Sequence, residues 1–219
     1  YEGMEREIKE IKEFVRTVKM RGYERVVFIG EGVPYAKAAA GVAERGGYPE
    51  IVVLESMLPE AIREIERKIN LKKTLFVVSS PVPGPAYGAY KHFHRQLAKL
   101  YSDQGVSGQE ITSEVGRHFV GIVEANRPFA KEAREKEFLK VFTEEIGTPY
   151  SIFSNKGLLP LAMVGVNIER FVESGKVGKE MCERENLAEN PGVQLGVSLE
   201  KMIEAGRKIV LVLPEELMG

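Results

Sequence analysis

The chain has 219 residues, of which 43% are hydrophobic and 29% are charged, and its 31 basic and 32 acidic residues give a net charge of −1. This length and composition predict a soluble globular protein with one substantial core. The balanced charge excludes a general attraction to nucleic acid or to anionic membranes. The longest apolar runs, such as 209–213, are too short to span a bilayer.

Cysteine usage and the first residues bear on the compartment. Cys182 is the single cysteine, which excludes an internal disulfide and a cysteine-based metal cluster. We therefore expect a cytoplasmic location, with neither a metal nor another cofactor. The charged first residues do not resemble a signal peptide, and the start at Tyr1 leaves room for further upstream sequence. Abundant Glu and Lys with one cysteine is also typical of thermophilic proteins.

Helices and strands are predicted to alternate along the chain. Apolar residues at helical spacing predict an amphipathic helix over 5–20. The segments that follow are predicted, in chain order, as a strand at 25–29, a helix at 34–45, a strand at 50–54, a helix at 59–69, a strand at 74–78, a helix at 86–100, a strand at 118–123, a helix at 128–136 and a short strand at 141–142.

Two further segments differ from this alternation. The polar stretch 102–114 is rich in Gly, Ser and Gln and is interpreted as a mobile surface insertion. The pattern over 156–206 is helical throughout, and 208–213 is predicted as a final strand. We expect a domain at 1–155, followed at 156–219 by a helical extension with a final strand of the same fold, or by the start of a second half.

Strands separated by helices predict an α/β fold, a three-layer αβα sandwich around a doubly wound, mostly parallel sheet. A change in strand order then creates a crevice at the carboxyl ends of the strands. Three predicted loops lie at that edge and carry the candidate ligand residues: 30–35, 79–87 and 145–154.

The first of these loops has the pattern of an anion site. The strand Val26–Ile29 runs into Gly30, Glu31 and Gly32, and the next helix opens with Pro34. Glycines permit a tight turn, and free N–H groups at a helix start attract anions. A tight turn without a ligand is the alternative interpretation of this pattern. In the second loop, Ser79 and Ser80 close a buried strand and could equally satisfy local backbone groups.

The three loops, taken in order, resemble the phosphoglucose isomerase family and its sugar-isomerase (SIS) domain. The family's Gly-Gly-Ser-Ser loop corresponds to residues 30–35, and its Ser-Ser-Lys-Ser-Gly-Thr-Thr loop to residues beginning at Ser79. Its Gly-Gly-Arg-Tyr-Ser motif corresponds to 147–151, and 157–162 continue the likeness. The run at 189–196 is similar to the isomerase half of bacterial fusions with transaldolase.

This resemblance implies an isomerase-like domain of carbohydrate metabolism that binds an aldose or ketose 6-phosphate and associates as a homodimer. The substrate-binding residues that it implies are Gly30, Gly32, Val33, Tyr35, Ser79, Ser80, Gly84, Tyr150 and Ser151. A small phosphorylated sugar or related anion is the expected partner, and no nucleic acid or membrane is expected.

Several positions depart from the family pattern. The family's serine, lysine, serine and threonine are replaced here by Pro34, Pro81, Val82 and Pro85, and its arginine is replaced by Pro149. The family's catalytic carboxylate, histidine and lysine come from sequence beyond this domain. The catalytic residues are therefore unknown, and the enzyme assignment stays open. The alternative is an inactive SIS module that senses a small anionic metabolite or mediates assembly.

Overall fold

The structure is a computed structural model that describes residues 4–42, 48–79, 84–124, 126–144 and 152–210. Its centre is a five-stranded sheet with the order β2-β1-β3-β4-β5, in which each neighbouring pair is parallel. The strands are β1 (Arg25–Gly30), β2 (Glu50–Leu54), β3 (Thr74–Ser79), β4 (Phe119–Glu124) and β5 (Lys140–Glu144). The α/β class and the parallel sheet that the sequence predicts are confirmed.

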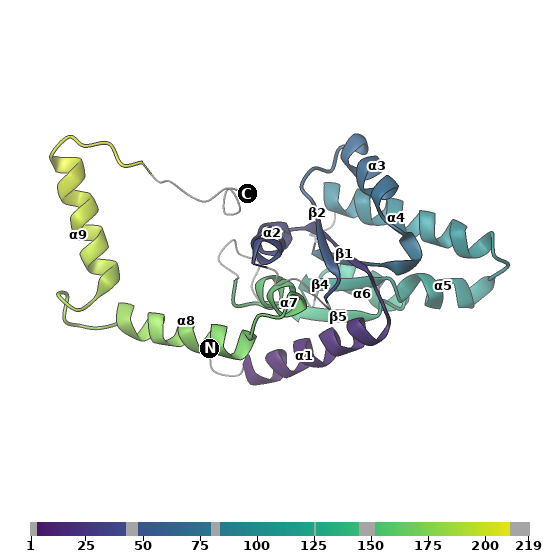
Figure 1. Ribbon diagram of the computed structural model, residues 1–219, viewed down its shortest axis with the longest axis horizontal. Coiled ribbons are helices and arrows are strands. Elements are labelled where there is room, and N and C mark those ends of the chain that lie inside the picture. The colour runs from purple at the N-terminus through teal and green to yellow at the C-terminus, as the bar shows by residue number, and fades with distance from the viewer. Residues whose placement is uncertain (1–3, 43–47, 80–83, 125, 145–151, 211–219) are drawn as a thin grey trace.

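Helices cover both faces of this sheet (Figure 1). They are α1 (Met4–Met20), α2 (Val33–Gly41), α3 (Pro59–Lys68), α4 (Pro85–Ser102), α5 (Gly108–Gly116), α6 (Pro128–Glu135), α7 (Asn155–Met163), α8 (Ile168–Cys182) and α9 (Pro191–Glu204), with a short 3-10 turn at Leu71–Lys73. Strands and helices alternate up to β5, as the hydrophobic pattern predicts, except that a second helix, α5, follows α4 before β4.

The alternation of side chains along β1 shows how the core is divided. Val26 and Phe28 lie on the face covered by α1, α2, α7 and the start of α8. Val27 and Ile29 lie on the other face, which α3 to α6 cover. A strand buried on both faces needs a continuous apolar run, and β1 and β3 have one. The two apolar clusters on either side of the sheet therefore form the core of a three-layer sandwich.

The C-terminal helices differ in how they pack. In α7, Leu158 and Leu159 are buried in the cluster on the α1 side of the sheet. Helix α8 begins against the same layer but then runs away from it, and α9 follows as an arm (Figure 1). No residue of α9 is buried, and Leu195 and Ile203 are largely exposed.

Two predicted segments are corrected by the structure. The stretch 102–114, predicted as a mobile surface insertion, is largely helical: α4 continues to Ser102, Gly105 turns the chain with a φ of +87°, and α5 begins at Gly108 and packs against α4. Its polar composition concealed a helix whose apolar side is short. The strand predicted at 208–213 is wrong for 208–210, which are exposed and form no strand, and 211–213 lie outside the described residues.

Candidate functional site at the carboxyl edge of the sheet

The strand order places a switch point between β1 and β3. The chain leaves β1 for β2 on one side and then crosses to β3 on the other side. Helix α2, after β1, covers one face of the sheet, and α4, after β3, covers the other. In doubly wound sheets, ligands bind in the crevice that such diverging connections open. The residues that end β1 and β3 are therefore the first place to look for a site.

Gly30 and Ser79 are paired at the carboxyl ends of these two strands. Gly30 has a φ of +99°, and a Cβ atom on it would lie 1.9 Å from the Ser79 carbonyl oxygen. The amide of Glu31 donates a hydrogen bond of 2.8 Å to that same oxygen. Glycine is required here for both conformation and space. The turn after β1 is thus held directly against the end of β3.

Gly32 brings a third segment into the site. It is the N-cap of α2, and a Cβ on it would lie 3.9 Å from both the Lys156 carbonyl oxygen and the Ser79 Cβ. The first turn of α2, which contains Pro34, carries no acidic side chain. The N-terminal end of α2, which carries a partial positive charge, therefore lies beside the carboxyl end of β3 and the first turn of α7.

Lys156, in the first turn of α7, supplies a buried cation at this point. Its side chain is 6% exposed, and its Nζ lies 2.7 Å from the Glu31 Oε2. The Glu31 side chain is 48% exposed. Ser154 caps α7 by accepting a hydrogen bond from the Lys156 amide. The ammonium group is thus fixed in the protein, while the carboxylate that balances it reaches into solvent.

Two buried polar atoms at the end of β3 and the start of α7 have no hydrogen-bond partner among the described residues: the Ser79 Oγ and the Asn155 Oδ1. Asn155 also donates from its Nδ2 to the carbonyl oxygen of Thr143 in β5, at 3.3 Å. A buried polar group that lacks a partner costs about 1–3 kcal/mol. A ligand at this edge of the sheet is one explanation for such unsatisfied atoms.

The predicted site residues are placed as follows. Gly30, Gly32 and Ser79 come together, and Gly84 is the N-cap of α4, the helix that follows β3. Val33 packs against the core and Tyr35 is partly buried in α2, so Val33 can offer a ligand its backbone only. Ser80, Tyr150 and Ser151 lie outside the described residues.

Sequence reasoning missed Lys156, Glu31 and Asn155. A signal for Lys156 did exist, because it directly precedes Gly157-Leu158-Leu159, the apolar start of a buried helix. A lysine next to a buried helical stretch has little access to solvent, and this proximity is the sequence signal for a buried cation. Glu31 lies within the predicted loop 30–35, but its pairing with Lys156 has no signal in the sequence, and none is visible for Asn155.

A second polar cluster lies beside the first turn of α4. Glu132 of α6 accepts hydrogen bonds from Tyr87, Tyr90 and Lys91. Burial alone would raise the pKa of Glu132, but the hydrogen bonds from Lys91 and the two phenols outweigh it and lower that pKa. The cluster ties α4 to α6 and so helps to fix the start of α4, which follows the predicted loop at 79–87.

The geometry at the carboxyl edge suits an anion. It combines the fixed ammonium of Lys156, the hydroxyl of Ser79 and the positive ends of α2 and α7. Within the described part of the chain, no group of three or more His, Cys, Asp or Glu side chains could hold a metal ion. Nor is any described helix long and apolar enough to cross a membrane.

Comparison with known proteins gives related sequences. No family model matches the chain. A glucose-6-phosphate isomerase of Carboxydothermus hydrogenoformans is 26% identical over 174 residues, covering 78% of this chain and 35% of that protein. A glucose-6-phosphate isomerase of Mycoplasmopsis pulmonis is 27% identical over 206 residues, covering 88% of this chain and 45% of that protein.

Solved structures show the same fold. A hypothetical protein of Thermus thermophilus superimposes with a TM-score of 0.68 at 22% identity, over 89% of this chain and 46% of that one. A glucose-6-phosphate isomerase of Chlamydia trachomatis gives a TM-score of 0.66 at 22% identity, over 91% of this chain and 37% of that one. The chain therefore spans less than half the length of these relatives.

Proposed function

Because the chain is a glucose-6-phosphate isomerase-like domain related to the phosphoglucose isomerase family, we propose that it binds a phosphorylated sugar at the carboxyl edge of its sheet. The phosphate lies between the loop after β1 and the first turn of α7. Lys156 and Ser79 contact it together with the N–H groups at the start of α2. The chain contributes binding, and isomerisation needs groups beyond those gathered at this site.

The buried ammonium of Lys156 is the observation that carries the proposal. Prolines replace several of the expected donors in the loops, yet the Lys156 side chain, 6% exposed, reaches the loop after β1, where its Nζ lies 2.7 Å from the Oε2 of Glu31, the residue before Gly32. A hydrogen bond to a charged group contributes about 1.5–3 kcal/mol. Lys156 thus supports phosphate binding by a donor that differs in position from the loop donors of the family.

Glu31 forms an ion pair with Lys156 when no ligand is present. Its carboxylate is the partner of Lys156 at 2.7 Å and is half exposed, so it can turn into solvent when a phosphate takes its place. The phosphate must displace the Glu31 carboxylate from Lys156, and the two negative groups then remain close to each other. Binding is therefore weakened by Glu31, and removal of that charge strengthens it.

The test is calorimetric titration of the full chain with glucose 6-phosphate, fructose 6-phosphate and unphosphorylated glucose. We expect both phosphosugars to bind with one site and glucose to give no heat. Glu31→Gln should tighten phosphosugar binding about tenfold, since one repulsive contact is removed. Glu50→Gln is the matched control, because Glu50 pairs with Arg25 at the opposite end of β1 and should leave the affinity unchanged.

Three results would contradict the proposal: no binding of either phosphosugar, equal binding of glucose, or weaker binding by the Glu31→Gln variant. An isomerase assay on the same samples should show no turnover by the chain alone. Sustained turnover would mean that the catalytic groups lie within this chain, and the division between binding and chemistry would then be wrong.

A further inference from the structure

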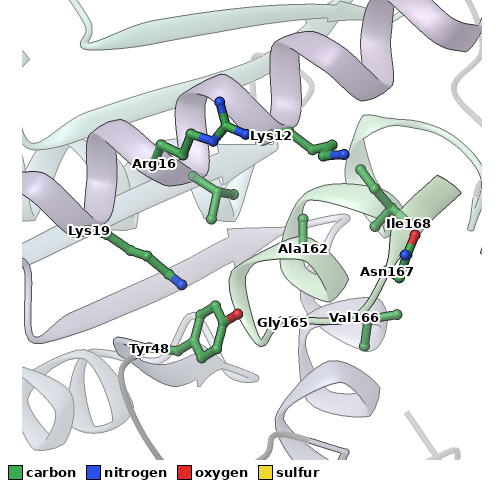
Figure 2. Close-up of a pocket in the computed structure, with 10 residues that line it drawn as sticks. Lys12, Arg16, Lys19, Tyr48, Ala162, Gly165, Val166, Asn167 and Ile168 are labelled. Carbon is green, nitrogen blue, oxygen red and sulfur yellow. The ribbon is translucent and has the colours of Figure 1, made fainter.

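A second cationic hollow lies between α1 and the turn that joins α7 to α8, and its volume is about 280 Å³ (Figure 2). Lys12, Arg16 and Lys19 line it from α1. Their spacing of four and three residues places them along one side of the helix. The apolar face of α1 packs on the core, so these cations border the core at its edge.

The opposite wall is built around Gly165. This residue has a φ of +91°, and a Cβ on it would lie 2.7 Å from the Tyr48 ring. Tyr48 therefore packs on bare backbone and closes one end of the hollow, where the Lys19 Nζ lies 3.5 Å from the ring centroid. Asn167, the N-cap of α8, lines the other end, so the positive end of that helix adds to the field.

The charges around this hollow are not balanced. Lys12 pairs with Glu169 at 2.8 Å. Arg16 and Lys19 have no carboxylate within ion-pair distance among the residues that the structure describes. Arg16, Lys19 and the start of α8 therefore line one small concave space, and Lys19 points across it toward Tyr48 (Figure 2). Such convergence of cations on a cavity is the usual chemistry of an anion site.

This hollow is separate from the site at the carboxyl edge. Lys19 precedes β1 and Tyr48 precedes β2, so both lie at the amino ends of the strands. Helix α7 runs between the two edges, with Lys156 in its first turn and Gly165 just beyond its last residue. The volume of the hollow, about 280 Å³, is slightly below the range of typical ligand pockets, which is roughly 300–1,000 Å³.

We propose that this hollow binds a small phosphorylated anion, with Arg16 and Lys19 as its charged contacts and Tyr48 as the aromatic residue that closes one end. A phosphate group on a small organic body fits the volume, the two cations and the aromatic ring. The ligand binds independently of the phosphosugar at the opposite edge of the sheet.

The test uses pyrophosphate as the probe, titrated into the full chain by calorimetry and followed by the amide NMR signals of Gly165 and Asn167. We expect binding that shifts these signals, and a loss of at least tenfold in affinity for the double variant Arg16→Gln/Lys19→Gln. Both side chains are exposed, so the variant should fold. The matched control is Arg95→Gln/Lys99→Gln on α4, which makes the same charge change on the other layer and should bind normally.

The Lys156→Met variant distinguishes the two sites, since it should leave pyrophosphate binding at Gly165 and Asn167 unchanged. No binding of pyrophosphate, or equal weakening by the α1 and α4 double variants, would overturn the proposal. Signals that shift only near Gly30 and Ser79 would also overturn it, because the probe would then occupy the carboxyl edge alone.

Discussion

Lys156 and Glu31 form an ion pair that joins the first turn of α7 to the loop after β1, with 2.7 Å between Nζ and Oε2. The pair is asymmetric, because the cation is 6% exposed and the anion 48%. Burying an ammonium group costs free energy unless a negative group stays close. The protein thus keeps a positive charge at the switch point of its sheet and balances it with a carboxylate that another anion can replace.

Lys156→Met separates the role of this cation in binding from its role in folding. Phosphosugar affinity should fall at least tenfold, since a charged hydrogen bond is worth about 1.5–3 kcal/mol. The free energy of unfolding should change little or rise, because an apolar chain of similar length replaces a buried charge while Glu31 stays solvated. Calorimetric titration and urea denaturation measure the two effects. Unchanged affinity would exclude Lys156 from the site.

Gly30→Ala should destabilise the fold by more than about 2 kcal/mol, since the new Cβ meets a carbonyl oxygen at 1.9 Å and the φ of +99° is unfavourable for alanine. The measurement is the urea midpoint. Gly88→Ala in α4 is the control: its Cβ meets nothing within 4 Å, so this variant should gain about 0.5–1 kcal/mol. Similar effects of the two substitutions would contradict the close contact between β1 and β3.

Stability should fall as the pH drops below neutrality, because His94 is half-buried and neutral in the folded chain. Burial, with help from Lys136 and Lys91, lowers the pKa of His94 to about 4. The unfolded chain takes up this proton near its ordinary pKa of 6.5, so stability is lost between about pH 6.5 and 4. The loss is on the order of 2 kcal/mol after allowance for partial exposure.

Urea denaturation of the wild type and of His94→Phe between about pH 7 and pH 5 tests this prediction. Phenylalanine keeps the ring packing against Tyr90 and Phe119 and removes the proton uptake. The slope of stability against pH should become shallower but not vanish, because burial also lowers the pKa of His118. An unchanged slope would mean that His94 is protonated in the folded chain.

Glu132→Gln should lower the free energy of unfolding by about 1–3 kcal/mol at neutral pH, because the charged acceptor for Lys91 and for the phenols of Tyr87 and Tyr90 is lost. The low pKa of Glu132 means that its contribution is present above about pH 4.5 and is lost as the pH falls further. The difference between the two proteins should therefore shrink in acid. A constant difference would contradict the lowered pKa.

The parts that could be predicted from the sequence are those with one dominant physical cause. Continuous apolar runs such as Val26–Ile29 predict strands buried on both sides, and Gly30 marked a turn that other residues cannot adopt. Lys156 was missed because a lysine is usually exposed, and its burial depends on where α7 packs. The helix α5 was missed because polar composition alone does not distinguish a loop from a helix with one short apolar side.

The pairing of Gly30 with Ser79 also bears on how the protein folds. Along the chain, the two residues are separated by α2, β2 and α3. They therefore meet only after the crossover from β1 to β2 and the crossover from β2 to β3 have formed. Contacts between distant segments form late, because the entropy of loop closure is spent before they stabilise the chain. A ligand at this point would recognise the completed sheet alone, and its main kinetic effect would be to slow unfolding.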